Sequence, residues 1–292
     1  MRVAAVDVGS NSIRLLVAVV TGKGGVLPVL RDLKTTRLGK GFTGGRLLDE
    51  PVEKTLAVIT DFTRRAERAG AETVVLAATS AVRDAANRAD FVRRVEAVSG
   101  KKLLVLSGAE EARLGYLGVI SGLGGVAEGV VVDIGGGSTE FIWHRAGEVQ
   151  CRSVNAGAVR MTEGGYGRGE IRSLIQETLL SVRRDGYKEV VGVGGAVTTL
   201  AAMARQLRRY DPDQVHGYRL DRDTIDRMDT TLHAMSPTER LRLPGLQPER
   251  ADIIPAGARI LSRVLHGLQA GSVVVSEADI LYGLALEARR MS

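Results

Sequence analysis

The chain has 292 residues, a length that suits two domains better than one core. Hydrophobic residues make up 44% of it and charged residues 25%, which is typical of a folded globular protein and excludes a disordered one. Cys151 is the only cysteine, so an intramolecular disulfide is excluded and a reducing compartment is expected. The four histidines are scattered without metal-ligand spacing, so no zinc site is predicted.

The net charge is +6, and arginine predominates among the basic residues. Arginine suits an anionic partner, although a solvated basic surface explains the same charge. No run of five or more like charges and no aromatic-rich basic stripe indicates a nucleic-acid partner. Asp7 and Arg14 interrupt the first apolar runs, and no stretch approaches the roughly 18 apolar residues of a membrane span. We therefore expect no signal peptide, no membrane segment and a cytoplasmic location.

The first half of the chain predicts strands followed by alternating helices and strands. Apolar runs at 2–8 and 13–20 flank a polar turn and predict a β-hairpin. Apolar residues then recur at helical spacing between Pro51 and Ala66, and Gly70 ends the pattern. The other elements predicted in this half are strands at 26–38, 73–78 and 102–107 and helices at 88–99 and 109–121.

A glycine-rich stretch at 122–129 predicts the joint between two domains, 1–123 and 124–292. After it, the hairpin pattern returns. The elements predicted in the second half are strands at 129–134, 139–144, 148–154, 189–193 and 272–276, and helices at 169–184, 196–207, 221–235 and 249–268. Pro255 predicts either a kink or a late start for the last of these helices. A closing helix from about residue 278 is expected to pack back on the first domain.

The repeated hairpin is the most informative pattern. Asp7-Val8-Gly9-Ser10-Asn11-Ser12 and Asp133-Ile134-Gly135-Gly136-Gly137-Ser138 each combine an apolar strand ending in aspartate with a glycine-bearing turn and a return strand. Two such hairpins in successive domains are expected to face each other across a cleft.

Each turn offers donors for an anion. Glycine lets the backbone come close to a ligand and permits positive φ, so that several N–H groups converge, and hydroxyl and amide side chains add further donors. Ordinary hairpin turns are the alternative, but the second copy favours phosphate binding. The residues predicted to bind phosphate here are Gly9, Ser10, Asn11, Ser12, Gly135, Gly136, Gly137, Ser138 and Thr139.

Carboxylates beside these turns predict a magnesium site. Asp133 and Glu140 flank the second turn, and Asp7 could reach the same ion from the other domain. Mg²⁺ prefers one or two carboxylates together with phosphate oxygens and water. For Glu140 the alternative is an exposed strand residue.

Three further features are each weak evidence for a functional site. Gly194 and Gly195 follow a strand and open a helix, which indicates either an anion site or close packing. Glu110 and Glu111 begin a helix, where the helix dipole favours carboxylates without any functional role. Their spacing does not show which of the two faces the cleft. Arg83 follows a buried strand at the end where ligands gather in α/β sheets.

Six segments taken together resemble the exopolyphosphatase / guanosine pentaphosphate phosphohydrolase (Ppx/GppA) family. The segments are VAAVDVGSNSIRLLV, ATSAVRDAANRADF, LSGAEEARLGYLGV, VVDIGGGSTEF, VGVGGAVTTLA and ERADIIPAGARIL. The resemblance implies an α/β fold of two ribonuclease H-like domains around an interdomain cleft, as in the superfamily of actin, sugar kinases and chaperone ATPases. It assigns the catalytic carboxylate to Glu111 and suggests metal or phosphate roles for Asp133, Glu140, Asp7 and Arg83.

The resemblance implies an exopolyphosphatase that releases terminal orthophosphate by Mg²⁺-assisted attack of water, which Glu111 orients or deprotonates. Long family members carry further C-terminal helical domains, so this length favours short polyphosphate. The alternatives are a guanosine pentaphosphate 5′-phosphohydrolase, an ATP-using kinase or ATPase, and a non-catalytic nucleotide sensor. The family also suggests a homodimer.

Overall fold

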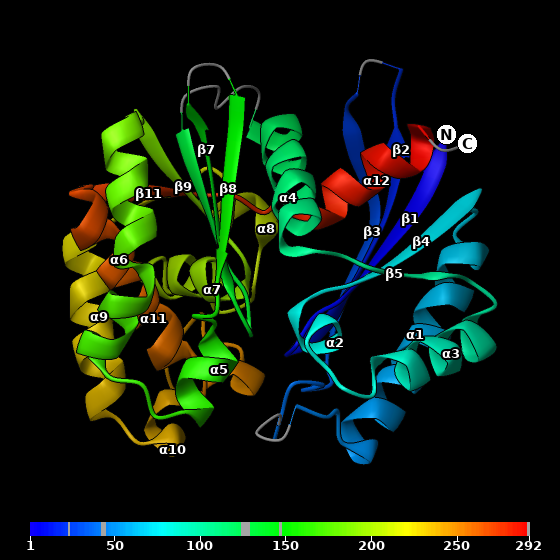
Figure 1. Cartoon of the computed structure of the whole chain (residues 1–292), viewed down its shortest axis with the longest axis horizontal. Helices are drawn as coiled ribbons and strands as arrows, with labels where there is room; N and C mark the ends of the chain where they lie inside the picture. Colours follow the sequence, from blue (N-terminus) through cyan, green and yellow to red (C-terminus); the bar gives the residue numbers. More distant parts are fainter. Residues whose placement is uncertain (23, 42–44, 124–128, 146–147, 291–292) are drawn as a thin grey trace. The chain divides into compact units, whose positions relative to one another are not determined.

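The computed structural model describes residues 1–22, 24–41, 45–123, 129–145 and 148–290. The chain forms two compact units (Figure 1). One unit contains Met1–Gly124 and Asp279–Ser292, and the other contains Gly125–Ala278. The last helix therefore belongs to the first unit, although it follows the second unit in sequence. Residues 124–128 of the predicted joint lie outside the described residues.

The first unit is built on a five-stranded sheet in the order β3-β2-β1-β4-β5. Its strands are β1 (Arg2–Val8), β2 (Ser12–Val20), β3 (Val26–Thr35), β4 (Thr73–Ala78) and β5 (Leu103–Val105). The first three strands pair antiparallel, whereas β1, β4 and β5 are parallel. The hairpin predicted from the first two apolar runs is confirmed, and its register places Asp7 directly opposite Arg14.

Helices cover both faces of this sheet. They are α1 (Asp49–Arg68), α2 (Ser80–Arg83), α3 (Arg88–Ser99), α4 (Gly108–Leu123) and α12 (Ile280–Arg290). Phe62 of α1 shares a core cluster with Ala4 and Val6 of β1. Val3 and Ala5 point to the opposite face and are fully buried, because α12 packs on β1 and β2. Burial on both faces explains the continuous apolar run of β1.

Two glycines bring α12 very close to α4. A Cβ atom on Gly118 would lie 1.8 Å from the carbonyl oxygen of Asp279, and one on Gly283 would lie 2.0 Å from that of Leu114. No other residue fits at either position without moving the backbone. The closing helix is therefore an integral part of the first unit.

The second unit repeats the same sheet with one addition. Its order is β10-β11-β9-β6-β7-β8, so that β6, β7, β8, β9 and β11 correspond in order and direction to β1–β5. The strands are β6 (Gly129–Ile134), β7 (Thr139–Arg145), β8 (Glu148–Val154), β9 (Glu189–Val193), β10 (Arg219–Asp221) and β11 (Ser272–Val275). The repeated order is that of two ribonuclease H-like domains, and β10 extends the edge of the second sheet antiparallel to β11.

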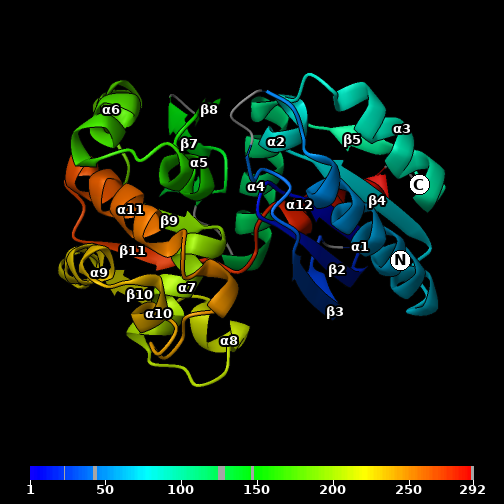
Figure 2. The ribbon, with the colours of Figure 1, turned by 90° about the horizontal axis from the view of Figure 1, so that it is seen from below.

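Helices of the second unit enclose its larger core. They are α5 (Ala158–Glu163), α6 (Arg168–Asp185), α7 (Gly195–Ala204), α8 (Pro212–Val215), α9 (Arg222–Ala234), α10 (Pro237–Arg240) and α11 (Ile254–Leu268). The apolar face of α11 packs against α9 and α6, and Figure 2 shows α9 and α11 side by side. No helix in the described ranges is long and apolar enough to cross a bilayer.

Several predicted bounds were wrong. The strand predicted at 26–38 ends at Thr35, and the one at 102–107 is confined to Leu103–Val105. For the helix predicted at 249–268, the alternative of a late start is confirmed: it begins at Ile254 with Pro255 in its first turn, after a 3₁₀ turn at Pro248–Arg250. Proline is tolerated at a helix start because no hydrogen bond is lost there. The short elements α2, α5, α8, α10 and β10 were not predicted, because three to six residues are too few to show a period.

Candidate active site

The first turn, residues 9–12, is fixed by the loop that follows β3. The Ser10 carbonyl oxygen accepts a hydrogen bond from the N–H of Gly39 at 2.7 Å. The Asn11 carbonyl oxygen accepts one from the N–H of Arg37 at 2.8 Å. The carbonyl groups of Ser10 and Asn11 thus point into the unit and are hydrogen-bonded to the loop after β3.

The second turn, residues 135–138, is held in the same manner by the start of α5. The carbonyl oxygens of Gly135 and Gly136 accept hydrogen bonds from the N–H groups of Ala158 and Val159 at 2.9 and 2.8 Å. A Cβ on Gly157 would lie 2.4 Å from backbone atoms of the turn, so the residue that precedes α5 must be glycine to approach so closely.

Both turns leave backbone donors for an anion. Within the described part of the chain, the N–H groups of Ser10, Asn11, Gly136 and Gly137 have no hydrogen-bond acceptor. Successive N–H groups of this kind form concave anion-binding sites. Thr139 differs, because its side chain is fully buried and its hydroxyl donates to the Ala156 carbonyl at 2.5 Å. The predicted phosphate contact from the Thr139 hydroxyl is therefore wrong.

Positive φ, one of the two expected reasons for glycine in the turns, was also wrong. Neither Gly9 nor Gly135 has a positive φ. A Cβ atom would instead lie 3.0 Å from the Ser12 carbonyl oxygen at Gly9 and 3.2 Å from the Ser138 carbonyl oxygen at Gly135. Glycine is favoured because each turn closes tightly on itself.

Asp7 keeps one carboxylate oxygen without a protein partner. Its Oδ2 accepts hydrogen bonds from Arg14 Nη2 at 2.6 Å and Nε at 3.1 Å, and Arg14 also pairs with Asp279. Its Oδ1 is buried and has no partner among the described residues. Burial raises the pKa of Asp7, although Arg14 opposes this shift. A buried carboxylate oxygen without a partner indicates a ligand, such as water or a cation.

A row of directly opposed side chains crosses the second sheet. Asp133 on β6 pairs with Glu140 on β7, and Glu140 pairs with Ser153 on β8, so all three point to one face. Glu140 is only 1% exposed and accepts a hydrogen bond from the Ser153 hydroxyl at 2.7 Å. The alternative of an exposed strand residue is therefore wrong for Glu140. Like charges directly opposite one another repel, and a cation relieves the repulsion.

The third glycine pair lies beside this row. Gly194 has a φ of +90°, and a Cβ there would lie 2.6 Å from Asp133 Oδ1. A Cβ on Gly195, the first residue of α7, would lie 2.1 Å from Arg250 Nη1. Positive φ and close packing against the backbone of Ile134 therefore explain Gly194, whereas Gly195 meets only the end of the Arg250 side chain. The buried Arg250 guanidinium also adds positive charge at the N-terminus of α7, which favours an anion there.

The structure separates the roles of the two adjacent glutamates. Glu110 caps α4: its Oε2 accepts hydrogen bonds from the Ser107 N–H at 2.9 Å and hydroxyl at 2.7 Å, which holds its pKa below the usual value. Glu111 instead accepts a hydrogen bond from Arg83 Nη1 at 2.8 Å. Arg83 is also anchored to the Leu106 carbonyl at 3.1 Å.

The first unit brings its predicted residues together through α2. The Ser80 hydroxyl at the start of α2 lies 3.1 Å from that of Ser10, and Arg83 at its end contacts Glu111. In the second unit, the turn at 135–138, Asp133, Glu140 and Gly194 adjoin one another. No group of three or more histidine, cysteine, aspartate or glutamate side chains suited to a metal occurs in the described part of the chain.

Sequence reasoning missed several residues that contact predicted ones or, as Asp279 does through Arg14, their partners. Five examples are Arg14, Ser80, Ser153, Arg250 and Asp279. Three of them, Arg14, Ser80 and Arg250, lie within the segments that carried the family resemblance. Ser153 and Asp279 gave no local signal in the sequence. The contact of Ser153 depends on strand register, and that of Asp279 depends on the packing of the chain's last segment in the first unit.

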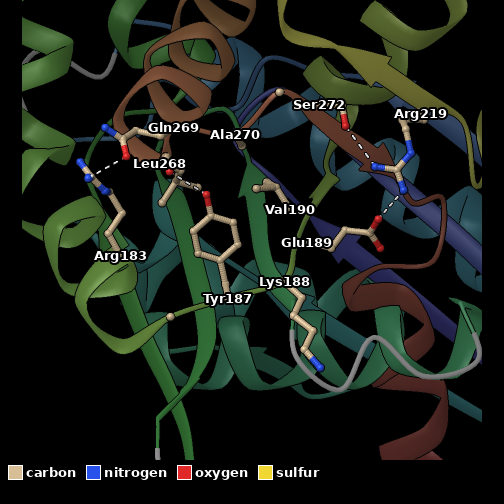
Figure 3. Close-up of a pocket in the computed structure, with 12 residues that line it drawn as sticks. Arg183, Tyr187, Lys188, Glu189, Val190, Arg219, Leu268, Gln269, Ala270 and Ser272 are labelled. Atoms are coloured by element: carbon tan, nitrogen blue, oxygen red, sulfur yellow. Dashed lines mark hydrogen bonds and ion pairs between the residues drawn. The ribbon is translucent and has the colours of Figure 1, made fainter.

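One cavity lined by described residues lies elsewhere. It adjoins the first residues of β9 and β11 and the last residues of α6 and α11 (Figure 3), and none of its lining residues was predicted as a site residue.

Comparison with known proteins identifies a consistent group of relatives. The model of the Ppx/GppA phosphatase family matches residues 16–288. A protein of Mycobacterium tuberculosis called exopolyphosphatase 2 is 35% identical, and the match covers 98% of each chain.

Solved structures agree with that match. A Ppx/GppA family member from Aquifex aeolicus has a TM-score of 0.83 and 30% identity, covering 100% of this chain and 98% of its own. An exopolyphosphatase-like protein has a TM-score of 0.89 and 32% identity, covering 99% of this chain and 98% of its own.

Proposed function

Because the chain belongs to the Ppx/GppA phosphatase family, we propose that it is an exopolyphosphatase that releases terminal orthophosphate from inorganic polyphosphate. The observation that carries the proposal is the opposed pair of Asp133 and Glu140, next to a turn with free backbone N–H donors. Two close carboxylates and an anion-binding turn suit a cation and a phosphate at one place.

The available oxygens fit Mg²⁺. Asp133 and Glu140 would hold the ion, and the unpartnered Oδ1 of Asp7 would contribute directly or through water. Hard carboxylate oxygens in this small number are what Mg²⁺ uses beside phosphate ligands. When bound, Mg²⁺ would neutralise charge on the phosphate oxygens.

The turns would position the phosphate chain. We propose that the N–H donors of residues 9–12 and those of residues 135–138 each bind phosphate groups, with Gly194 and Gly195 adding the positive end of α7 to the second turn. Glu111 would orient the attacking water in line with the terminal phosphorus, while Arg83 holds the Glu111 carboxylate in place. Phosphoryl transfer depends mainly on such positioning and on charge stabilisation.

The name of the M. tuberculosis relative supports polyphosphate over guanosine pentaphosphate as the substrate. Polyphosphate and guanosine pentaphosphate both present a terminal phosphoanhydride, which the same protein groups would bind. The preference for short chains, the homodimer and the cytoplasmic location stay predictions.

The test is phosphate release by the purified protein. Tripolyphosphate, long-chain polyphosphate and guanosine pentaphosphate should be compared, each with Mg²⁺ and with a chelator. We expect Mg²⁺-dependent release from polyphosphate without any acceptor molecule. ATP consumption that requires an acceptor would instead indicate a kinase.

Two variants test the carboxylate pair. Glu140→Gln should remove most of the turnover, because a neutral amide is a poor magnesium ligand. The matched control is Glu148→Gln, an exposed glutamate on β8. Equal activity of the two variants would overturn the metal assignment.

A further inference from the structure

One carbonyl group of the second turn is held by a side chain. The Gly137 carbonyl accepts a hydrogen bond from Nε of Arg160 at 2.8 Å. Arg160 lies in α5, and its own backbone N–H donates to the Gly136 carbonyl at 3.1 Å. Arg160 therefore contacts two successive peptide groups of the turn, one through its backbone and one through its side chain.

The direction of the Gly137 carbonyl decides where the next N–H group points. In a planar trans peptide, the carbonyl of one residue and the N–H of the following residue point in opposite directions. Because the Gly137 carbonyl points to Arg160 Nε, the Ser138 N–H points away from it. Ser138 is only 2% exposed, and its N–H has no acceptor in the described part of the chain. An N–H group of a buried residue that lacks a protein acceptor indicates a ligand or a water.

Ser138 thus adds a third donor to those of Gly136 and Gly137. The carbonyl groups that precede all three N–H groups are bound by α5, so the three donors are directed by one helix. Successive N–H groups of this kind bind an anion. Glycine leaves its backbone unusually free to rotate, so the orientation of the Gly137–Ser138 peptide depends on the hydrogen bond from Arg160.

We propose that Arg160 is a positioning residue, which orients the Ser138 N–H toward a phosphate oxygen bound in the turn. The inference rests on the proposed function and adds to it a residue that touches the turn but not the substrate. Donors that are oriented before the substrate binds need no reorganisation as charge develops on the phosphate. The cationic donor also polarises the Gly137–Ser138 peptide, which strengthens its N–H as a donor.

A purely structural role predicts a different result. Arg160 would then only join α5 to the turn, and its loss would lower the free energy of unfolding without changing turnover per folded molecule. The backbone hydrogen bonds from α5 and the close approach of Gly157 remain when the Arg160 side chain is removed, so the turn should keep its place.

The test compares Arg160→Met with Arg160→Gln. Methionine has no donor, whereas glutamine carries an amide N–H as many bonds from Cα as the arginine Nε. We expect kcat/KM for polyphosphate to fall about 10-fold in Arg160→Met and no more than about 3-fold in Arg160→Gln. The matched control is Arg172→Met, which removes an exposed arginine from α6 and should leave kcat/KM unchanged.

A second measurement follows the Ser138 amide itself. Inorganic phosphate titrated into the wild type should shift the Ser138 amide resonance in a proton–nitrogen correlation spectrum. This shift should be absent in Arg160→Met and present in Arg160→Gln. Urea denaturation of each variant gives the folded fraction by which turnover is divided.

An unchanged kcat/KM in Arg160→Met would overturn the positioning role, as would an equal loss in Arg160→Met and Arg160→Gln. A Ser138 shift that persists in Arg160→Met would also overturn it. The proposed function fails separately: if the wild type released no phosphate from any substrate, but inorganic phosphate still shifted the Ser138 resonance in the wild type and not in Arg160→Met, the role of Arg160 in anion binding would stand.

Discussion

The two adjacent glutamates at the start of α4 should respond to mutation in opposite ways. Glu111→Gln is expected to abolish most turnover and to preserve the fold. Glu110→Ala is expected to preserve turnover per folded molecule and to lower stability. The reason is that Glu111 contacts Arg83 beside the proposed site, whereas Glu110 only caps the helix.

The magnitudes follow from these contacts. A positioned carboxylate acting on water contributes about 10² to 10⁴ in rate, equivalent to about 3–5 kcal/mol of activation free energy. In Glu111→Gln the amide oxygen can still accept from Arg83, so the loss in unfolding free energy should be about 1 kcal/mol or less. Glu110→Ala removes the acceptor of two hydrogen bonds from Ser107 and should cost about 0.5–2 kcal/mol.

The assays are steady-state phosphate release and chemical denaturation on each variant. Because the hydrogen bonds from Ser107 lower the pKa of Glu110, its stabilisation is present above the ordinary pKa of 4.5 and is lost as pH falls through the lower folded value. The difference in unfolding free energy between wild type and Glu110→Ala should therefore become smaller as the pH falls below 4.5. Full turnover in Glu111→Gln, or equal loss of turnover in both variants, would refute the assignment.

Three more changes test the site and the fold. Ser153→Ala removes the hydrogen bond to the buried Glu140 carboxylate, so the Mg²⁺ concentration for half-maximal activity should rise about 10-fold in a metal titration. Gly283→Ala places a methyl group 2.0 Å from the Leu114 carbonyl oxygen and should lower the free energy of unfolding by about 1–3 kcal/mol or more in urea. Asp7→Asn should inactivate the enzyme yet raise the stability of the metal-free protein at neutral pH. Burial raises the pKa of Asp7, so its ionisation costs stability that is absent below pH 3.8 and grows as pH rises through the folded pKa.

Matched controls separate these effects from general damage. Ser173→Ala, whose hydroxyl bonds only its own helix, should leave the Mg²⁺ dependence unchanged. Gly115→Ala lies on α4 with open space around the added methyl group, so it should be neutral or stabilising by up to about 1 kcal/mol. If the Asp7→Asn variant were no more stable than wild type at pH 7, ionisation of the buried Asp7 carboxylate would not lower the free energy of unfolding.

The repeated hairpin could be predicted from the sequence because its information is local. An apolar strand, a polar glycine-bearing turn and a return strand are visible within 15 residues, and both copies formed with Asp7 and Asp133 at strand ends. The sequence did not predict why glycine occurs at the start of each turn. It shows that Gly9 and Gly135 lack a side chain, but not which carbonyl oxygen a Cβ atom would contact.

Tertiary structure alone decided the contacts between distant residues. Glu110 and Glu111 are adjacent and chemically identical, and only the positions of Ser107 and Arg83 give them different roles. The Ser153 contact with Glu140 depends on strand register, and the place of α12 depends on the fit of Gly283 against α4. Local patterns specify which elements form, because backbone geometry has a short period. Which side chains meet is settled by how those elements pack, and packing joins residues that no local pattern relates.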